Sequence, residues 1–158
     1  MREIPTFLKD MLIQQYGEII TNKIIDGYKT RNVSFRVNNL KSNKEKIEKE
    51  LKKANITYKN VNWYNDAFII ENVREDEIKN LSIYENGEIY LQSLSSMLPP
   101  LFLDLKKDEN ILDMAAAPGG KTTEMASISN DEVFITACEK NKIRADRLKY
   151  NLDKQGVK

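Results

Sequence analysis

The sequence contains no histidine and only one cysteine, Cys138. This inventory excludes a histidine–cysteine metal site and an internal disulfide, and a lone cysteine suits a reducing compartment. No apolar run approaches the roughly 20 residues that span a bilayer. The first residues also lack the apolar stretch and small-residue cleavage site of a signal peptide. We therefore expect a cytoplasmic protein with no metal and no membrane segment.

The formal net charge of +1 over 158 residues hides an uneven distribution of charge. Residues 29–59 hold ten lysines and arginines against three glutamates, whereas residues 66–88 hold seven acids against two bases. A polyanion such as RNA would exploit a concentrated basic stretch of this kind. A solvated, charge-rich helix face is the alternative, and we prefer it for the lysine run over residues 44–53.

The first 90 residues predict a small α+β module. Apolar residues recur at helical spacing between residues 4 and 12, and Gly17 is suited to end that helix. From Val33 to Val37 the apolar period changes to two, which predicts a half-buried strand. Ser42 and Glu45 have the spacing of a capping box, and a helix is expected after them. The other expected elements are a helix over 18–28, strands over 56–58 and 67–70, and helical turns over 76–81.

Residues 91–158 predict the first part of a Rossmann-like α/β domain, after a boundary between residues 86 and 100. The expected elements are a strand over 111–114, a loop over 115–120, a helix over 121–129, a strand over 133–137 and a helix over 141–154. This βαβα order predicts a parallel sheet with crossover helices. Two parallel strands make a poor sheet. We therefore expect this domain to be incomplete and the chain to be a truncated fragment.

The segment from Asp113 to Thr122 (DMAAAPGGKT) carries the main chemical signal. It follows a predicted strand and opens a predicted helix, and its small residues let a ligand approach the backbone closely. The start of the helix offers free N–H groups to a carboxylate. Nineteen residues after Gly120, Glu139 follows the second predicted strand. In dinucleotide-type folds an acid at that place accepts hydrogen bonds from ribose hydroxyls.

Several ligands compete for such a loop. A phosphate-binding P-loop needs a glycine where Ala115 stands, although Gly120, Lys121 and Thr122 fit its end. The G-x-G-x-x-G pattern of an NAD site is absent. A strand-to-helix turn without any ligand leaves the acid at position 139 without a role. The remaining interpretation is a site for S-adenosylmethionine.

The pattern Asp-x-x-Ala-Ala-Pro-Gly-Gly-Lys-Thr resembles the cofactor motif of the Nol/Nop/Sun (RsmB/RsmF) family of RNA cytosine carbon-5 methyltransferases. Residues 90–100 (YLQSLSSMLPP) resemble the segment that precedes this motif in the family, with Ser93 in place of the usual acid. Residues 34–41 (SFRVNNLK) resemble its Arg-x-Asn-x-Leu-Lys segment. The opening residues 5–11 and Trp63 are most similar to the RsmF branch, which modifies small-subunit ribosomal RNA.

The resemblance implies a parent enzyme that moves a methyl group from S-adenosylmethionine to carbon 5 of cytosine in RNA, preferably ribosomal RNA, and acts as a monomer. It implies ribose binding by Glu139 and cofactor contacts by Ala115, Ala116, Ala117, Pro118, Gly119, Gly120 and Lys121. It also implies a cysteine thiolate that attacks carbon 6 of the base and a second cysteine that assists product release. The family carries them in Pro-Cys and Thr-Cys motifs, and neither motif occurs here.

Without those cysteines we expect the chain itself to be catalytically inactive, with Cys138 as a buried or half-buried packing residue. The alternative function is a non-catalytic RNA-binding or assembly module that uses the basic stretch 29–59.

The sequence leaves other side-chain roles open. Arg36 and Asn38 alternate with the apolar residues of their strand, so they either face RNA or tie the two modules together. Arg144 and Arg147 either touch RNA or pair with acids, and we prefer the ion pairs. The aromatic residues of the first module could stack on bases, although core packing is preferred. They are Tyr58, Trp63 and Tyr64.

Overall fold

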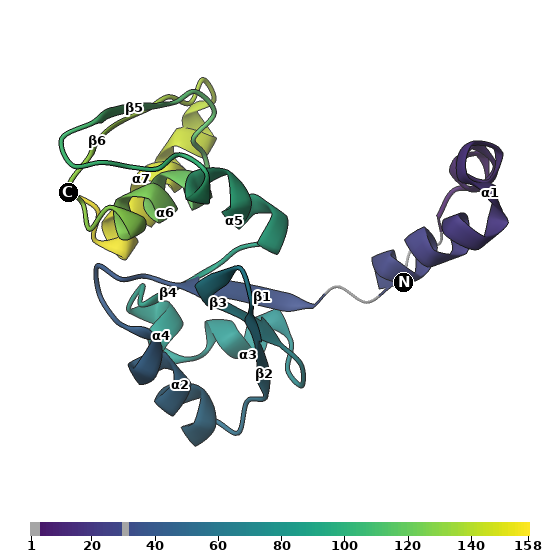
Figure 1. The fold of residues 1–158 in the computed structure, drawn as a ribbon, viewed down its shortest axis with the longest axis horizontal. Coiled ribbons are helices and arrows are strands. Elements are labelled where there is room, and N and C mark those ends of the chain that lie inside the picture. Colours follow the sequence, from purple (N-terminus) through teal and green to yellow (C-terminus); the bar gives the residue numbers. More distant parts are fainter. Residues whose placement is uncertain (1–3, 30–31) are drawn as a thin grey trace. The chain divides into compact units, whose positions relative to one another are not determined.

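The computed structural model describes residues 4–29 and 32–158, and the chain divides into two compact units between residues 32 and 33. The first unit contains α1 (Thr6–Lys29), which is interrupted at Gly17, where φ is 76° and ψ is 165°. Figure 1 shows α1 as two helical pieces. The predicted stop at Gly17 is therefore confirmed. None of the helices in the described ranges combines the length and the apolar character that a membrane span requires.

The second unit begins with a four-stranded antiparallel sheet in the order β2-β3-β1-β4 (Figure 1). Its strands are β1 (Val33–Val37), β2 (Tyr58–Val61), β3 (Tyr64–Ile70) and β4 (Ile89–Leu91). The connecting helices are α2 (Lys44–Lys53), α3 (Glu75–Lys79) and α4 (Ser82–Glu85). β1 is an inner strand, with Phe35 opposite Phe68 of β3 and Leu91 of β4. The predicted small α+β module is thus confirmed.

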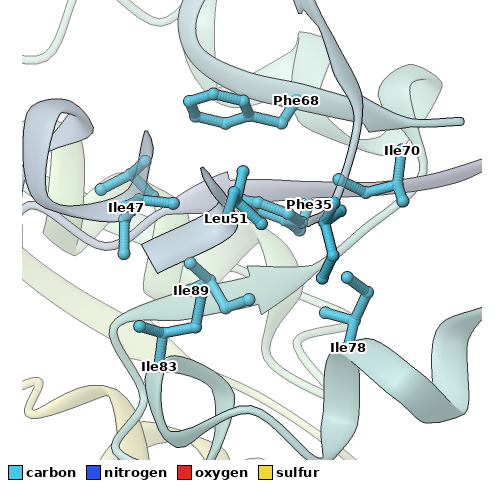
Figure 2. Close-up of a cluster of buried hydrophobic side chains, with 10 residues drawn as sticks. Phe35, Ile47, Leu51, Phe68, Ile70, Ile78, Ile83 and Ile89 are labelled. Atoms are coloured by element: carbon cyan, nitrogen blue, oxygen red, sulfur yellow. The ribbon is translucent and has the colours of Figure 1, made fainter. Parts of the chain in front are cut away.

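One face of this sheet packs against the three helices and forms the main hydrophobic core (Figure 2). The rings of Phe35 and Phe68 stack with their centroids 5.2 Å apart. Burial of each large apolar side chain in such a core contributes roughly 1.5–3 kcal/mol. The fully or nearly fully buried members are Phe35, Val37, Ile47, Leu51, Ile56, Phe68, Ile70, Ile78, Ile83 and Ile89.

The opposite face of β1 is buried as well, and on this point the prediction of a half-buried strand is wrong. The side chains of Arg36 and Asn38 are 0% exposed. On this side of the sheet, Met97 of α5 (Leu94–Leu101) packs with Val61, Tyr64 and Ala67. A strand with one polar face is normally open to water on that face, but here α5 and the helix that follows the glycine loop cover it.

The start of α2 also differs from the prediction. The capping residue is Asn43, whose side-chain oxygen accepts a hydrogen bond from the backbone N–H of Lys46 at 2.9 Å. Ser42 instead donates its hydroxyl to Glu88 at 3.0 Å. Asparagine and serine cap helices equally well. The choice between them here is decided by a carboxylate that lies 46 residues further along the chain.

The remaining elements form a two-stranded parallel sheet with its helices, as the βαβα pattern predicts. They are β5 (Asn110–Asp113), α6 (Gly120–Ile128), β6 (Phe134–Ala137) and α7 (Lys142–Gln155). The incomplete Rossmann-like arrangement is therefore confirmed. Neither β4 nor α5 was predicted, because β4 is three residues long and Pro99 and Pro100 indicate a boundary. The predicted domain boundary at residues 90 and 91 stays a prediction.

The end of α7 docks on the antiparallel sheet. The Asn38 amide donates to the carbonyl oxygens of Gly87 and Gln155 at 2.8 and 2.7 Å. Gly87 has φ +71°, and a Cβ there would lie 2.1 Å from the carbonyl oxygen of Lys154. A glycine is needed at this position for both reasons. The antiparallel sheet with α2, α3 and α4 is called the antiparallel module below, and the elements from α5 to α7 are called the parallel module. These contacts fix the parallel strands and their glycine loop against the antiparallel module.

Candidate functional site

The glycine loop joins β5 to α6, and its conformation is held from both ends by Asp113. One carboxylate oxygen of Asp113 accepts from the backbone N–H of Ala115 at 3.3 Å, and the other accepts from the Thr122 hydroxyl at 2.7 Å. Gly119 caps α6 with φ 109°, in the left-handed region that favours glycine. A Cβ on Gly119 would also lie 3.1 Å from the Leu148 side chain. The sequence of the loop thus specifies its shape.

A cavity of about 220 Å³ opens between this loop and the end of β4 with the residues that follow it. Six of the predicted cofactor contacts line it: Ala115, Ala116, Ala117, Pro118, Gly120 and Lys121. The opposite wall is formed by Tyr90, Leu91, Gln92, Ser93 and Ser96. Gly119 does not line the cavity, and a Cβ there would be directed toward Leu148 of α7. The role of all seven as cofactor contacts stays a prediction.

The wall over residues 90–96 was not predicted as part of the site. The sequence signal was present, because this segment carries one of the stretches that resemble the family. Its position beside the glycine loop follows from the fold. α5 packs against α6, and the Lys121 ammonium lies 3.4 Å from the Ser96 hydroxyl. The segment therefore forms part of the cavity although it comes before β5 in the chain.

Glu139 follows β6 but does not line this cavity. One of its carboxylate oxygens accepts from the backbone N–H of Asn141 at 2.9 Å. The other, Oε2, forms an ion pair with Arg144 at 3.2 Å without hydrogen-bond geometry. The carboxylate is only 6% exposed, and Oε2 has no hydrogen-bond donor among the described residues. Such a buried acceptor is costly unless a donor reaches it, and a ribose hydroxyl is a donor of the right kind.

Arg144 connects the two halves of the candidate site. Besides its ion pair with Glu139, it donates to the carbonyl oxygen of Ala117 at 2.7 Å. The guanidinium therefore joins the end of β6 to the glycine loop after β5. The preferred interpretation of Arg144, pairing with an acid, is confirmed. Arg147 has no partner among the residues that the structure describes.

Arg36 ties the two modules together, which decides one question that the sequence left open. It donates to the Gln92 side chain at 3.0 Å and to the Thr123 hydroxyl at 2.7 Å. Gln92 in turn donates to the Glu124 carboxylate at 2.7 Å. This buried network lies behind the cavity and links β1, the cavity wall and α6.

The network changes the acidity of its members. Burial raises the pKa of Glu124 to about 7, although Arg36 and Gln92 oppose the shift. Burial also lowers the pKa of Arg36, while Glu124 acts in the other direction. Removing charged groups from water always favours their neutral forms. Arg36 Nη1 and Glu124 Oε1 have no hydrogen-bond partner among the described residues, yet the remaining bonds of the network fix the register between the two modules.

Two sequence interpretations need correction or refinement. Cys138 is exposed and is not a packing residue. Exposed and half-buried positions alternate along β6, and Cys138 lies on the same exposed side as Phe134, which is 64% exposed. In the aromatic group, Tyr64 is buried and Tyr58 packs edge-on against Phe68, whereas Trp63 is 47% exposed. Core packing is thus confirmed for the two tyrosines only.

Two family models match this chain, each over a different part of it. Residues 100–158 match the family described as 16S rRNA methyltransferase RsmB/F, and residues 4–75 match its RsmF/B-like ferredoxin-like domain. Ribosomal RNA small subunit methyltransferase F of Shewanella oneidensis is 35% identical over 126 residues, which are 78% of this chain and 27% of that protein. A tRNA (cytosine(49)-C(5))-methyltransferase of Pyrococcus abyssi is 40% identical over 131 residues, or 82% and 42% of the two chains.

Solved structures give the same result for the fold. A methyltransferase homologue from Pyrococcus horikoshii superposes with a TM-score of 0.82 at 32% identity, covering 98% of this chain and 50% of that one. NSun6 from the same organism, crystallised with SFG, an analogue of S-adenosylmethionine, superposes with a TM-score of 0.84. At 21% identity that second likeness supports the fold alone. The chain spans between a quarter and two thirds of the length of these relatives and solved structures.

Proposed function

The chain belongs to the RsmB/RsmF family of methyltransferases, and on that premise we propose that its cavity at residues 115–121 holds S-adenosylmethionine. The observation that carries the proposal is a glycine-cradled cavity together with a buried acid, Glu139, whose Oε2 is paired with Arg144 but has no hydrogen-bond donor in the described part of the chain. The loop fits close approach of a ligand to the backbone, and Glu139 Oε2 fits a ribose hydroxyl. Glu124 on α6 also has a buried acceptor oxygen without a donor in residues 4–29 and 32–158, but its carboxylate belongs to the network with Arg36 and Gln92.

In this proposal each group of residues binds a different part of the ligand. The free N–H groups in the first turn of α6 and the Lys121 ammonium hold the carboxylate of the ligand. The backbone from Ala115 to Ala117 passes along the ligand, and Glu139 accepts from the ribose. Asp113 and Arg144 touch the loop but not the ligand, so they are positioning residues.

We further propose that the parent activity is methylation of cytosine carbon 5 in RNA by a monomer. The cofactor supplies an electrophilic methyl group, and a cysteine thiolate adds to carbon 6 so that carbon 5 can accept that group. Loss of the carbon-5 proton then releases the thiolate. Both ribosomal and transfer RNA enzymes are among the relatives. We favour ribosomal RNA, because the N-terminal residues are most similar to the RsmF branch.

The 158 residues alone are proposed to bind the cofactor without turning it over. Their only cysteine is Cys138, which directly precedes the proposed ribose acid and lacks the Pro-Cys or Thr-Cys context that the resemblance requires. Incubation with RNA and methyl-labelled cofactor is expected to yield no methylated cytosine. Labelled product would show that this chain is complete as a catalyst.

Isothermal titration calorimetry with S-adenosylhomocysteine tests the cofactor site directly. Loss of a hydrogen bond to a charged group costs about 1.5–3 kcal/mol, so Glu139→Ala is expected to weaken binding by roughly 10- to 100-fold. Asp146→Asn, which changes an exposed acid on α7, the helix that follows Glu139, is the control and should bind like the wild type. No heat with the wild-type chain would overturn the cofactor site and favour the alternative, a non-catalytic RNA-binding module.

A further inference from the structure

The basic stretch over residues 29–59 is largely engaged within its own module. Three of its lysines form ion pairs with N–O distances of 2.6–2.7 Å: Lys46–Glu88, Lys53–Glu50 and Lys59–Glu71. Arg36 is buried, and Lys41 donates to the backbone carbonyls of Asn86 and Lys154. Residues 30 and 31 lie outside the described residues. Between residues 32 and 59, only Lys49 and Lys52 have no described partner, so this stretch offers little free positive charge.

A second groove adjoins the cofactor cavity. Tyr90, Leu91 and Pro118 line both, so the two hollows share a wall. The groove has a volume of about 470 Å³, which is within the range of sites that hold ligands of nucleotide size. Its other walls come from α3 and α4 on the antiparallel module and from α7.

The charge of this groove is positive. Arg147 and Lys154 lie seven residues apart on α7, on the face that lines the groove. Arg147 is exposed and has no described partner, and the Lys154 ammonium lies 3.8 Å from the centre of the Tyr84 ring. At the rim, Lys79 pairs with Glu75 at 2.7 Å. Three cations therefore face one carboxylate, and one of the cations is free.

We propose that this groove binds the sugar-phosphate backbone of single-stranded RNA, with Arg147 as its main phosphate contact. The proposal rests on the proposed function, because it places the RNA strand beside the methyl donor. A guanidinium forms paired hydrogen bonds with phosphate oxygens. Grooves for single strands combine positive charge with aromatic side chains, and Tyr84 and Tyr90 supply the aromatic part here. A strand that leaves the groove past Pro118 reaches the cofactor cavity directly.

Fluorescence anisotropy with a labelled single-stranded RNA tests this assignment. Arg147→Gln is expected to weaken binding roughly 3- to 10-fold and to reduce the slope of log affinity against log salt by about 0.7. Lys149→Gln, an exposed lysine two residues along α7 and outside the groove, is the matched control and should change little. The double variant Lys49→Gln/Lys52→Gln tests the basic stretch in the same assay.

Three results would overturn the groove assignment. Equal losses in Arg147→Gln and Lys149→Gln would mean that RNA senses only the overall charge of α7. A larger loss in Lys49→Gln/Lys52→Gln would move the RNA surface to the basic stretch. Binding of inorganic phosphate or free nucleotide without binding of RNA would show that the groove is a site for small anions. Calorimetry with S-adenosylhomocysteine on Arg147→Gln, expected to match the wild type, separates these failures from a failure of the cofactor site.

Discussion

Arg36 of β1 and Glu124 of α6 lie 3.9 Å apart, and both side chains are completely buried. They come from opposite modules of the second unit, and Gln92 bridges them with a hydrogen bond to each. A buried pair of this kind is expensive to desolvate, so it is poor evidence for stability in itself. The pair instead specifies how the two modules are placed, because the two buried charges compensate each other in only one relative position of the modules.

Arg36→Met is expected to destabilise the chain by about 3–5 kcal/mol, since it leaves the Glu124 carboxylate buried without its cation. Urea unfolding followed by circular dichroism measures this change. Lys53→Ala, which breaks an exposed ion pair with Glu50, is the control and should cost at most about 0.5 kcal/mol. The double variant Arg36→Met/Glu124→Leu is expected to recover part of the loss. Equal effects of the buried and the exposed substitution would show that the pair does not join the modules.

Stability should also fall as the pH rises from about 4.5 to about 7. The folded-state pKa of Glu124 is raised to about 7 by burial, whereas an unfolded glutamate titrates near 4.3. Between these values the folded state binds more protons than the unfolded state, so the free energy of unfolding decreases with rising pH. Above about pH 7 both states are ionised at this residue, and its contribution to the slope ends.

Glu124→Gln is the variant that isolates this effect. The difference in unfolding free energy between variant and wild type should shift in favour of the variant from pH 4.5 to 7, by an amount on the order of 1–3 kcal/mol. Urea titrations at several pH values provide the measurement. Parallel pH profiles for the two proteins would mean that Glu124 ionises normally in the fold.

The local sequence pattern was sufficient to predict most of the helices and strands, although not β4 and α5. The features that it failed to predict depend on residues that are distant in the chain. The period of β1, the stop at Gly17 and the loop between β5 and α6 each depend on residues close together in the chain. The burial of Arg36 depends on Thr123, which is 87 residues away. The ion pair of Lys46 likewise depends on a distant acid, Glu88. No window along the sequence reports such pairs.

In the candidate site, too, some features follow from the local sequence and others depend on distant residues. The glycine loop and Glu139 could be found from the order of strand, loop and acid alone. The cavity wall over residues 90–96 could not, because an antiparallel strand and α5 bring it to the loop from a different module. The exposure of Cys138 was equally hidden, since a strand residue is buried only if some other element covers its face. The orientation of the Glu139 carboxylate required knowledge of Arg144.

Arg144→Gln is expected to weaken binding of S-adenosylhomocysteine by roughly 5- to 20-fold, because it removes a charge-assisted contact that holds both Glu139 and the Ala117 carbonyl. Calorimetry measures the loss, and Arg147→Gln on the same helix is the matched control. If Arg144 only supported the loop, its substitution would weaken the binding of all ligands equally. We therefore expect a much smaller loss for a ligand analogue that lacks the 2′-hydroxyl group, since Arg144 acts on the ribose through Glu139. Equal losses for both ligands would contradict that positioning role and reduce Arg144 to a brace for the loop.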